Sequence, residues 1–160
     1  MKINTFGSDI MDKVDLLILS YLKENARMKA SDISKEINYS ISSVLERIRK
    51  MEKSGIIEKY TVLLNEKKLG NDIVAIMEVS IKSPEFYDKF TETVMANKNI
   101  LSCYYLTGEF DFMLKIKTNS TENLEKIHRM IKSLDGVTGT KTHFALKEVK
   151  CEMSVIPDEE

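Results

Sequence analysis

Residues 30–57 constrain the fold of this chain more than any other stretch, because two short helical patterns follow one another there with a tight break between them. The first pattern has its apolar residues at helical spacing, at Ala30, Ile33 and Ile37. Asn38 and Tyr39 interrupt it, and Ser40 is placed to cap a second helix by accepting an amide hydrogen bond. Gly55 is expected to end that helix. Two short helices at this spacing are typical of DNA-binding proteins.

The second helix is expected to have an apolar side and a polar, basic side. At about 100° per residue, one side collects Ile41, Val44, Ile48 and Met51. The opposite side collects Ser42, Ser43, Glu46, Arg49, Lys50 and Lys53, with Arg47 at the boundary. Such a helix can dock on its own domain and present polar side chains to a DNA major groove, which is roughly 12 Å wide. The alternative is an ordinary solvated helix, because surface helices also carry Lys, Arg and Ser.

The neighbouring segments favour DNA binding over that alternative. Upstream, a third amphipathic helix is predicted from Val14, Leu17, Ile18, Tyr21 and Leu22. Downstream, residues 57–64 form an apolar β run that predicts a wing. Three helices and a wing indicate a DNA-binding domain.

The candidate DNA-contacting residues lie on and just before the second helix of the pair. They are Lys29, Ser40, Ser42, Ser43, Glu46, Arg47, Arg49 and Lys50. The four cations among them are expected to contact phosphates and set the register, while the serines can hydrogen-bond to base edges. Glu46 can accept from a cytosine amino group, or it can be a solvated residue paired with Lys50, and both alternatives stay open.

Charge is distributed unevenly along the chain. Residues 1–70 hold 13 Lys and Arg against 10 Asp and Glu, a net of +3, and the remaining 11 and 15 leave −4 for residues 71–160. Only the first part suits a polyanion. Because +3 is modest, salt-sensitive DNA binding is expected to need two or more copies acting together.

Other functional classes find little support in the sequence. No apolar run approaches the roughly 20 residues of a membrane span, and the N-terminus lacks a secretory pattern, so a cytoplasmic protein without a membrane partner is expected. Cys103 and Cys151 have no spacing that predicts a disulfide scaffold or a metal site. Together with His128 and His143 they form no catalytic motif, and no Gly-rich phosphate loop is present, so neither an enzyme nor a required cofactor is predicted.

The second half has the order of a different domain. Strands are predicted at residues 73–81, 100–106, 110–117, 140–146 and 149–155, with a bulge or bend near Lys147. Helices are predicted after Pro84 and around the apolar positions Leu124, Ile127, Ile131 and Leu134. The order β, α, β, β, α, β with a trailing strand is that of a ferredoxin-like fold, so the whole chain is of the α+β class. The predicted parts are residues 1–60, a linker strand at 61–71, and a second domain at 72–160.

The sheet of this second domain is expected to leave one apolar face uncovered. The face opposite the helices would carry Val74 and Ile76, with one of Tyr104 and Tyr105 and one of Phe112 and Met113. A second copy would bury that face, so a homodimer held by the second domain is predicted.

Further residues carry a resemblance to a known family. They include Asp12, Asp15, Ile18 and Leu19 in the first helix, and Ser40, Val44, Arg47, Ile48, Met51, Glu52, Gly55, Ile57 and Tyr60 in and after the second of the pair. More specific are the turn Thr107, Gly108, Glu109, Phe110, Asp111 and the segment Thr140, Lys141, Thr142. Over nearly its whole length the chain resembles the Lrp/AsnC family of bacterial and archaeal transcription regulators. Asp135 departs from the Pro that the family often has at that turn.

The resemblance implies an N-terminal winged helix-turn-helix and a C-terminal domain, often called RAM, that forms dimers and higher assemblies such as tetramers or octamers. It also implies a small effector, commonly an amino acid, bound between subunits. The expected effector-binding residues are Gly108, Glu109, Asp111, Thr140 and Thr142. Backbone amides at a Gly turn can hold a carboxylate, the acidic residues can attract an ammonium group, and the Thr hydroxyls can donate.

Two alternatives accompany this mechanism. From chemistry alone, Gly108 and Glu109 make an ordinary hairpin turn and the threonines merely favour a strand; the resemblance reverses that preference. The predicted mechanism has a dimer binding the half-sites of a roughly palindromic operator, with the effector shifting the assembly. The alternative function is an architectural DNA-binding protein that needs no effector.

Overall fold

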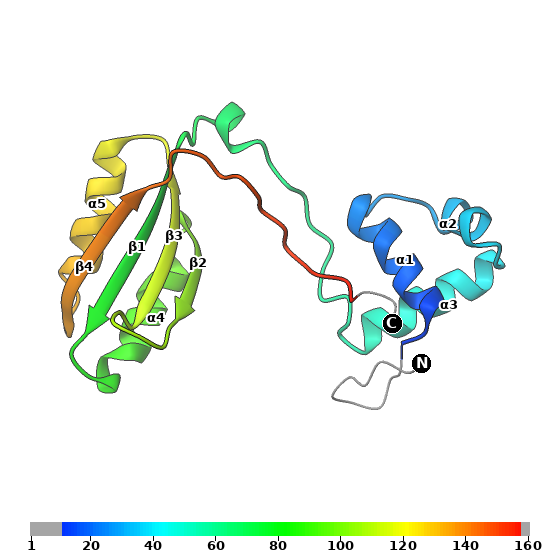
Figure 1. The fold of residues 1–160 in the computed structure, drawn as a ribbon, viewed down its shortest axis with the longest axis horizontal. Helices are drawn as coiled ribbons and strands as arrows, with labels where there is room; N and C mark the ends of the chain where they lie inside the picture. The colour runs from blue at the N-terminus through cyan, green and yellow to red at the C-terminus, as the bar shows by residue number, and fades with distance from the viewer. Residues whose placement is uncertain (1–10, 158–160) are drawn as a thin grey trace. The chain divides into compact units, whose positions relative to one another are not determined.

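The computed structural model describes residues 11–157 and divides into two compact units (Figure 1). The first unit runs to Leu63 and also includes the end of the chain from Glu152, whose carboxylate pairs with Lys23 at 3.2 Å. The second unit spans Leu64–Cys151. The domain bounds drawn from the sequence, at 60 and 72, remain a proposal.

The first unit contains three helices, α1 Lys13–Glu24, α2 Ala30–Ile37 and α3 Ile41–Lys53. A capping box starts α1, in which Asp12 accepts from the amide of Asp15 at 3.0 Å and the Asp15 carboxylate accepts from the amide of Asp12 at 3.1 Å. Asn38 ends α2 in the left-handed conformation, and Ser40 accepts from the amide of Ser43 at 3.2 Å, as predicted. Gly55 follows α3 at φ +78°.

These helices enclose a small core, formed by Ile18, Leu22, Ile33, Val44 and Met51. Two positions differ from the predicted apolar faces. Leu17 is 42 % exposed, and the neighbouring Leu16 is buried in its place. Ile41 is 48 % exposed, because the buried stripe of α3 begins about one turn later, at Val44.

The wing strand predicted for residues 57–64 does not form. Within the described residues this segment has no β partner, and a strand needs a neighbour to complete its backbone hydrogen bonds. The Tyr60 hydroxyl instead donates to Glu52 on α3 at 2.9 Å. The apolar side chains at 62–64 are left exposed. The prediction of a strand from the apolar residues of this segment is therefore wrong.

The second unit is a four-stranded antiparallel sheet with two helices, as the ferredoxin-like order predicts. A short 3₁₀ turn, η1 Glu66–Leu69, precedes it. The elements then run β1 Ile73–Ile81, η2 Pro84–Phe86, α4 Tyr87–Ala96, β2 Ile100–Tyr105, β3 Phe112–Thr118, α5 Thr121–Lys132 and β4 Val137–Phe144. The strand order is β2-β3-β1-β4, so β2 and β4 are the edges.

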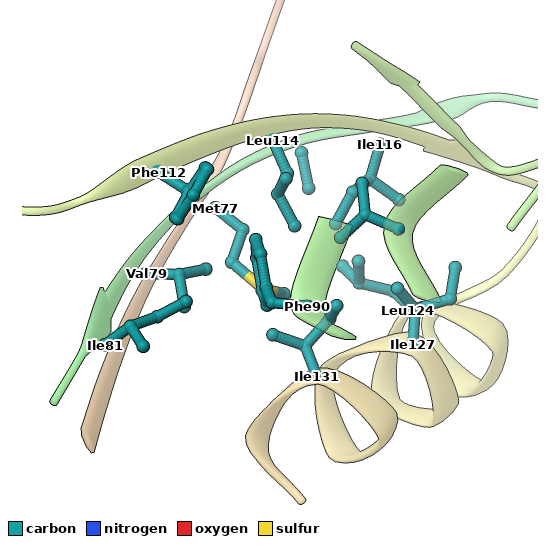
Figure 2. Close-up of a cluster of buried hydrophobic side chains, with 12 residues drawn as sticks. Met77, Val79, Ile81, Phe90, Phe112, Leu114, Ile116, Leu124, Ile127 and Ile131 are labelled. Atoms are coloured by element: carbon teal, nitrogen blue, oxygen red, sulfur yellow. The ribbon is translucent and has the colours of Figure 1, made fainter. Parts of the chain in front are cut away.

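One large apolar core lies between this sheet and its helices (Figure 2). Every second residue of β1 is buried from Ala75 to Ile81, which confirms the predicted alternation. Strand β3 and the helices supply the rest, at Phe112, Leu114, Ile116, Phe90, Val94, Leu124, Ile127 and Ile131. The sequence left open which of Phe112 and Met113, and which of Tyr104 and Tyr105, lies on the sheet face opposite the helices. Phe112 is in the core, so Met113 and its cross-strand partner Tyr104 lie on that face.

The trailing strand predicted for residues 149–155 does not form, whereas the bulge or bend predicted near Lys147 corresponds to a bend at the neighbouring Leu146. Strand β4 is an edge, and within the described residues no ladder pairs with the chain after it. The sheet has its irregularities elsewhere, between Ser80 and Ile81 of β1 and between Ile100 and Ser102 of β2. Glu148 instead forms ion pairs with Lys115 and Lys117 of β3. The alternation of residues 149–155 was not enough to form a strand, because no neighbouring strand among residues 11–157 is available to pair with it.

Candidate DNA-binding helix and effector site

Helix α3 presents the polar side that the sequence predicts. Ser42, Glu46, Arg49 and Lys50 are exposed, whereas Val44 and Met51, on the opposite side, are 0 % and 2 % exposed. Ser43 is half-buried. Ser40 caps the helix and also hydrogen-bonds to the Ser42 hydroxyl at 3.0 Å. Lys29 stands at the N-cap of α2, exposed and without a side-chain cap bond.

The Arg47 guanidinium, on the boundary between the two sides of α3, has charged protein partners. Its Nη1 donates to both carboxylate oxygens of Asp12, at 2.9 and 2.8 Å, and to Asp15 at 2.7 Å. The guanidinium carbon also lies 5.9 Å from the centre of the Tyr39 ring. Arg47 therefore links α3 to the start of α1 and orients the helix whose outer side carries Arg49 and Lys50.

The contacts between Arg47, Asp12 and Asp15 shift the pKa values of Arg47 and Asp12. The hydrogen bond to Asp15 is the largest effect on Arg47 and raises its pKa further above an already high value, while partial burial opposes it. For Asp12, partial burial alone would raise the pKa, but the amide of Asp15 and the Arg47 guanidinium outweigh it and lower the pKa below 3.8. Asp12 and Arg47 are therefore both charged near neutral pH, and the Arg47 charge is compensated within the protein.

The second unit contains an open pocket of about 300 Å³ between α5 and β4. Its lining is Thr121, Leu124, Glu125, His128, Thr142 and Phe144. The Thr142 hydroxyl oxygen is buried and has no hydrogen-bond partner among residues 11–157. A buried hydroxyl without a partner is unfavourable, so a ligand that completes its hydrogen bonding would gain affinity from this residue. Thr140, two residues earlier on β4, hydrogen-bonds to His128 Nε2 at 3.1 Å.

The Gly108 turn lies elsewhere in the same unit. Gly108, at φ +143°, and Glu109 are exposed between β2 and β3, and nothing lies within 4 Å of a Cβ built on Gly108. The Asp111 carboxylate accepts from the amide of Ile81 at 2.6 Å and from the Tyr87 hydroxyl at 2.8 Å. The hydrogen bond from the Tyr87 hydroxyl to Asp111 is the main reason that the pKa of Tyr87 is raised above its usual value. Asp111 therefore joins β3 to β1 and α4.

Within one chain, the structure brings together only part of the predicted effector site. Thr142 lines the pocket and Thr140 contacts its wall, whereas Gly108, Glu109 and Asp111 are not among the lining residues, and the Asp111 carboxylate is bonded to β1 and to Tyr87. Prediction from the sequence missed the residues of the pocket contributed by α5. Thr121, Leu124, Glu125 and His128 recur at helical spacing, which is a usable signal, but the strand that faces them was not known.

The described residues include no helix that is both long enough and apolar enough to cross a membrane. The two units instead correspond to two known kinds of domain. Residues 11–58 match a winged helix-turn-helix DNA-binding domain, and residues 74–155 match the Lrp/AsnC ligand binding domain.

Whole-chain comparisons agree with these matches. The chain is 30 % identical over 143 residues to the leucine-responsive regulatory protein of Haemophilus influenzae, covering 88 % of this chain and 86 % of that protein. It is 33 % identical over 139 residues to the transcriptional regulator LrpC of Bacillus subtilis, covering 87 % and 94 %. A transcriptional regulator of Neisseria meningitidis, solved as a complex with L-Met, superposes with a TM-score of 0.86 at 31 % identity, covering 91 % of this chain and 96 % of that one.

A helix-turn-helix and a ligand-binding domain in one chain define a DNA-binding transcriptional regulator, a class of protein that is not enzymatic. The chain belongs to the Lrp/AsnC family of such regulators. The resemblance found in the sequence is thereby confirmed.

Proposed function

We propose that this protein binds specific DNA sequences as an assembly of identical subunits and that an amino acid effector changes that assembly and its DNA binding. The observation that carries the proposal is the combination, in one chain, of an exposed basic helix side on α3 and an open pocket with an unpaired buried hydroxyl at Thr142. The two features belong to separate compact units, as a ligand-controlled regulator requires.

The DNA-binding part of the proposal uses the exposed polar side of α3. Lys29, Arg49 and Lys50 are the proposed phosphate contacts, and Ser42, Ser43 and Glu46 the proposed contacts to base edges. Ser40 contributes by capping the helix. Arg47 is proposed to orient α3 rather than to bind a phosphate, because Asp12 and Asp15 already accept its hydrogen bonds.

The effector part of the proposal uses the pocket between α5 and β4. Thr142 offers a hydroxyl that lacks a partner, and Leu124 and Phe144 offer an apolar wall. Glu125 also lines the pocket; one of its carboxylate oxygens accepts from Arg129, and the other is proposed to receive an α-ammonium group. The related Neisseria protein was solved with L-Met, which supports an amino acid as the class of effector. Gly108 and Glu109 are exposed at their turn, so they are proposed to reach the effector of a neighbouring subunit.

The assembly is proposed to start from a homodimer of the second unit. Val74, Ile76 and Met113 share the sheet face opposite the helices and are only half-buried in a single chain. The same face carries polar groups, with His143 Nε2 and Glu78 Oε2 3.3 Å apart. A second copy that covers this face would bury apolar surface while keeping these polar pairs. Larger assemblies such as tetramers or octamers are proposed to form from the dimers.

The proposal is tested by calorimetric titration of the full chain with each of the twenty amino acids, followed by light-scattering measurement of its size with and without any that bind. DNA binding to a random-sequence duplex library is then measured under the same two conditions. We expect saturable binding, a changed assembly size and a changed DNA affinity, because an effector acts only through a difference in affinity between two states.

Two results would overturn parts of the proposal. If no amino acid binds while specific duplexes are still enriched from the library, the protein is a regulator without an amino acid effector. If duplexes of all sequences bind equally and no amino acid has an effect, it is the architectural DNA-binding protein that the sequence left as an alternative.

A further inference from the structure

The start of α3 carries exposed apolar side chains beside its basic side. Ile41 is 48 % exposed and Leu45 38 %, and they lie one helical turn apart on the same flank. Tyr39, just before the helix, is 44 % exposed. At about 100° per residue, Leu45 is roughly 40° from Ile41 around the helix, and Arg49 is roughly 40° further. The apolar flank therefore adjoins the proposed phosphate-binding side.

This flank is separate from the core of the first unit. The buried side of α3 is formed by Val44 and Met51, with Ile48 packed against the same cluster. Ile41 and Leu45 are not members of that cluster, so the stability of the three-helix unit does not account for their apolar character. Large apolar side chains that are exposed together commonly mark a contact surface.

We propose that Ile41 and Leu45 recognise thymine methyl groups in the major groove of the operator. This inference rests on the proposed function, since it assigns the bases that the same helix reads. In helix-turn-helix proteins the N-terminal residues of the second helix contact base edges. The C5-methyl group of thymine is the apolar group that a base edge presents there, and aliphatic side chains are its natural partners.

Charge and spacing favour DNA as the occupant of this flank over another protein. Ser42 and Arg49 lie beside it on α3 and suit a polyanion, while Glu52, on the same flank near the end of the helix, accepts a hydrogen bond from the Tyr60 hydroxyl. Four residues of helix span about 6 Å, which is close to two base-pair steps of about 3.4 Å. Ile41 and Leu45 therefore predict two thymines within one or two base pairs of each other in each half-site. Glu46, exposed on the same turn, favours a neighbouring cytosine if it contacts the bases.

The first experiment selects bound sequences from a random duplex library with the full-length protein. The wild type is compared with Ile41→Ser and Leu45→Ser, with Ile41→Val and Leu45→Met as conservative variants. Leu17→Ser is the matched control, because Leu17 is also an exposed leucine of the first unit, at 42 %, but lies on α1. We expect the Ser variants to lose the preference for thymine at one position each, and the Val, Met and control variants to keep it.

The second experiment uses wild-type protein only, so it does not depend on whether a variant folds. Each thymine of the selected duplex is replaced in turn by deoxyuridine, which removes the methyl group and keeps every hydrogen-bonding group. We expect affinity to fall about three- to four-fold at the two predicted positions, the effect of losing one buried methyl group, and to stay unchanged at flanking thymines.

The outcomes separate this inference from the function on which it rests. If the wild type enriches no sequence, sequence-specific binding itself is wrong. If it enriches a sequence but neither deoxyuridine nor the Ser variants change the preference, DNA binding stands and the methyl contact is overturned. A Ser variant that changes the size of the assembly while keeping the base preference would assign the flank to a contact between subunits and also overturn the inference.

Discussion

The Arg47 guanidinium donates from one nitrogen to both carboxylate oxygens of Asp12, at 2.9 and 2.8 Å, and so fastens α3 to the residue that caps α1. Asp12 thereby caps one helix and positions another. The same nitrogen also reaches Asp15, the partner of Asp12 in the capping box. The orientation of the proposed recognition helix is therefore coupled to the start of the first helix through one side chain.

Arg47→Met is expected to lower the stability of the first unit by about 1–2 kcal/mol, because charge-assisted hydrogen bonds to two partly exposed carboxylates are lost. It should leave the slope of log affinity for DNA against log salt concentration unchanged. Arg49→Ala is the matched comparison, since loss of a phosphate contact lowers that slope by about one unit. Anisotropy titrations at several salt concentrations measure the slope for both variants. A slope reduced by one unit in Arg47→Met would make Arg47 a phosphate contact.

Asp12→Asn is expected to destabilise the first unit by roughly 0.5–1 kcal/mol at pH 7, discounted because the Asp12 side chain is about half exposed. The folded-state pKa of Asp12 is below 3.8, so its stabilisation is fully present above that pH and is lost as pH falls through the lower folded value. Urea unfolding should therefore show wild type and variant converging as the pH falls below about 4. A difference that grows with acidity would contradict this assignment.

Asp111→Ala is expected to lower the stability of the second unit by about 2–4 kcal/mol, because the amide of Ile81 and the hydroxyl of Tyr87 both lose their acceptor. Glu109→Ala, two residues away and exposed, is the control and should change stability by no more than about 0.5 kcal/mol. Thermal unfolding measures both variants. If Asp111→Ala folds as stably as wild type but no longer responds to an amino acid, Asp111 is an effector-binding residue.

Thr142→Val is expected to abolish or strongly weaken amino acid binding without destabilising the fold, because Val has nearly the same shape and removes a buried hydroxyl that has no partner. Thr118→Val is the matched control. Its hydroxyl is also buried without a partner in the same unit, but Thr118 does not line the pocket. Calorimetry should show binding retained in Thr118→Val and lost in Thr142→Val; equal binding by the two variants would remove Thr142 from the site.

Gly136→Ala is expected to destabilise the second unit by more than about 2 kcal/mol, since a Cβ at Gly136 would lie 2.3 Å from Cγ of Phe86 and the backbone is at φ +85°. Gly70→Ala isolates the backbone effect. Gly70 has nearly the same φ, +83°, but nothing lies within 4 Å of its Cβ, so a cost of only about 1–2 kcal/mol is expected. Chemical unfolding of both variants gives the comparison, and equal losses would show that Phe86 moves aside.

Elements with a strong internal period were predictable from the sequence. Strand β1 begins and ends where its alternation predicted, at Ile73 and Ile81, and α3 begins directly after its cap, Ser40. The failures were residues 57–64, predicted as a strand from an apolar run, and residues 149–155, whose alternation is as clear as that of β1. A strand needs a second strand beside it, and alternation within one segment carries no information on whether that neighbour exists.

The candidate sites divide in the same way. The amphipathic pattern of α3 was enough to separate Val44 and Met51 from Arg49 and Lys50, because helical periodicity is a local property. The pocket was not predictable, because its residues lie on α5 and β4, which come together only when the sheet and the helices pack. The partners of Arg47 and Asp111 were hidden for the same reason, since each lies at least 24 residues away from its side-chain partner.

The amino-acid sequence by itself determined the order of the helices and of the four strands in the sheet, the Ser40 cap, the basic side of α3 and the family to which the chain belongs, because each of these depends on residue type and short-range spacing. Only the tertiary structure decided that Arg47 and Asp111 have protein partners, that Thr142 has none, and that Ile41 and Leu45 are exposed. These outcomes depend on which surfaces meet when the chain folds, and surfaces meet across distances in sequence that local patterns do not encode.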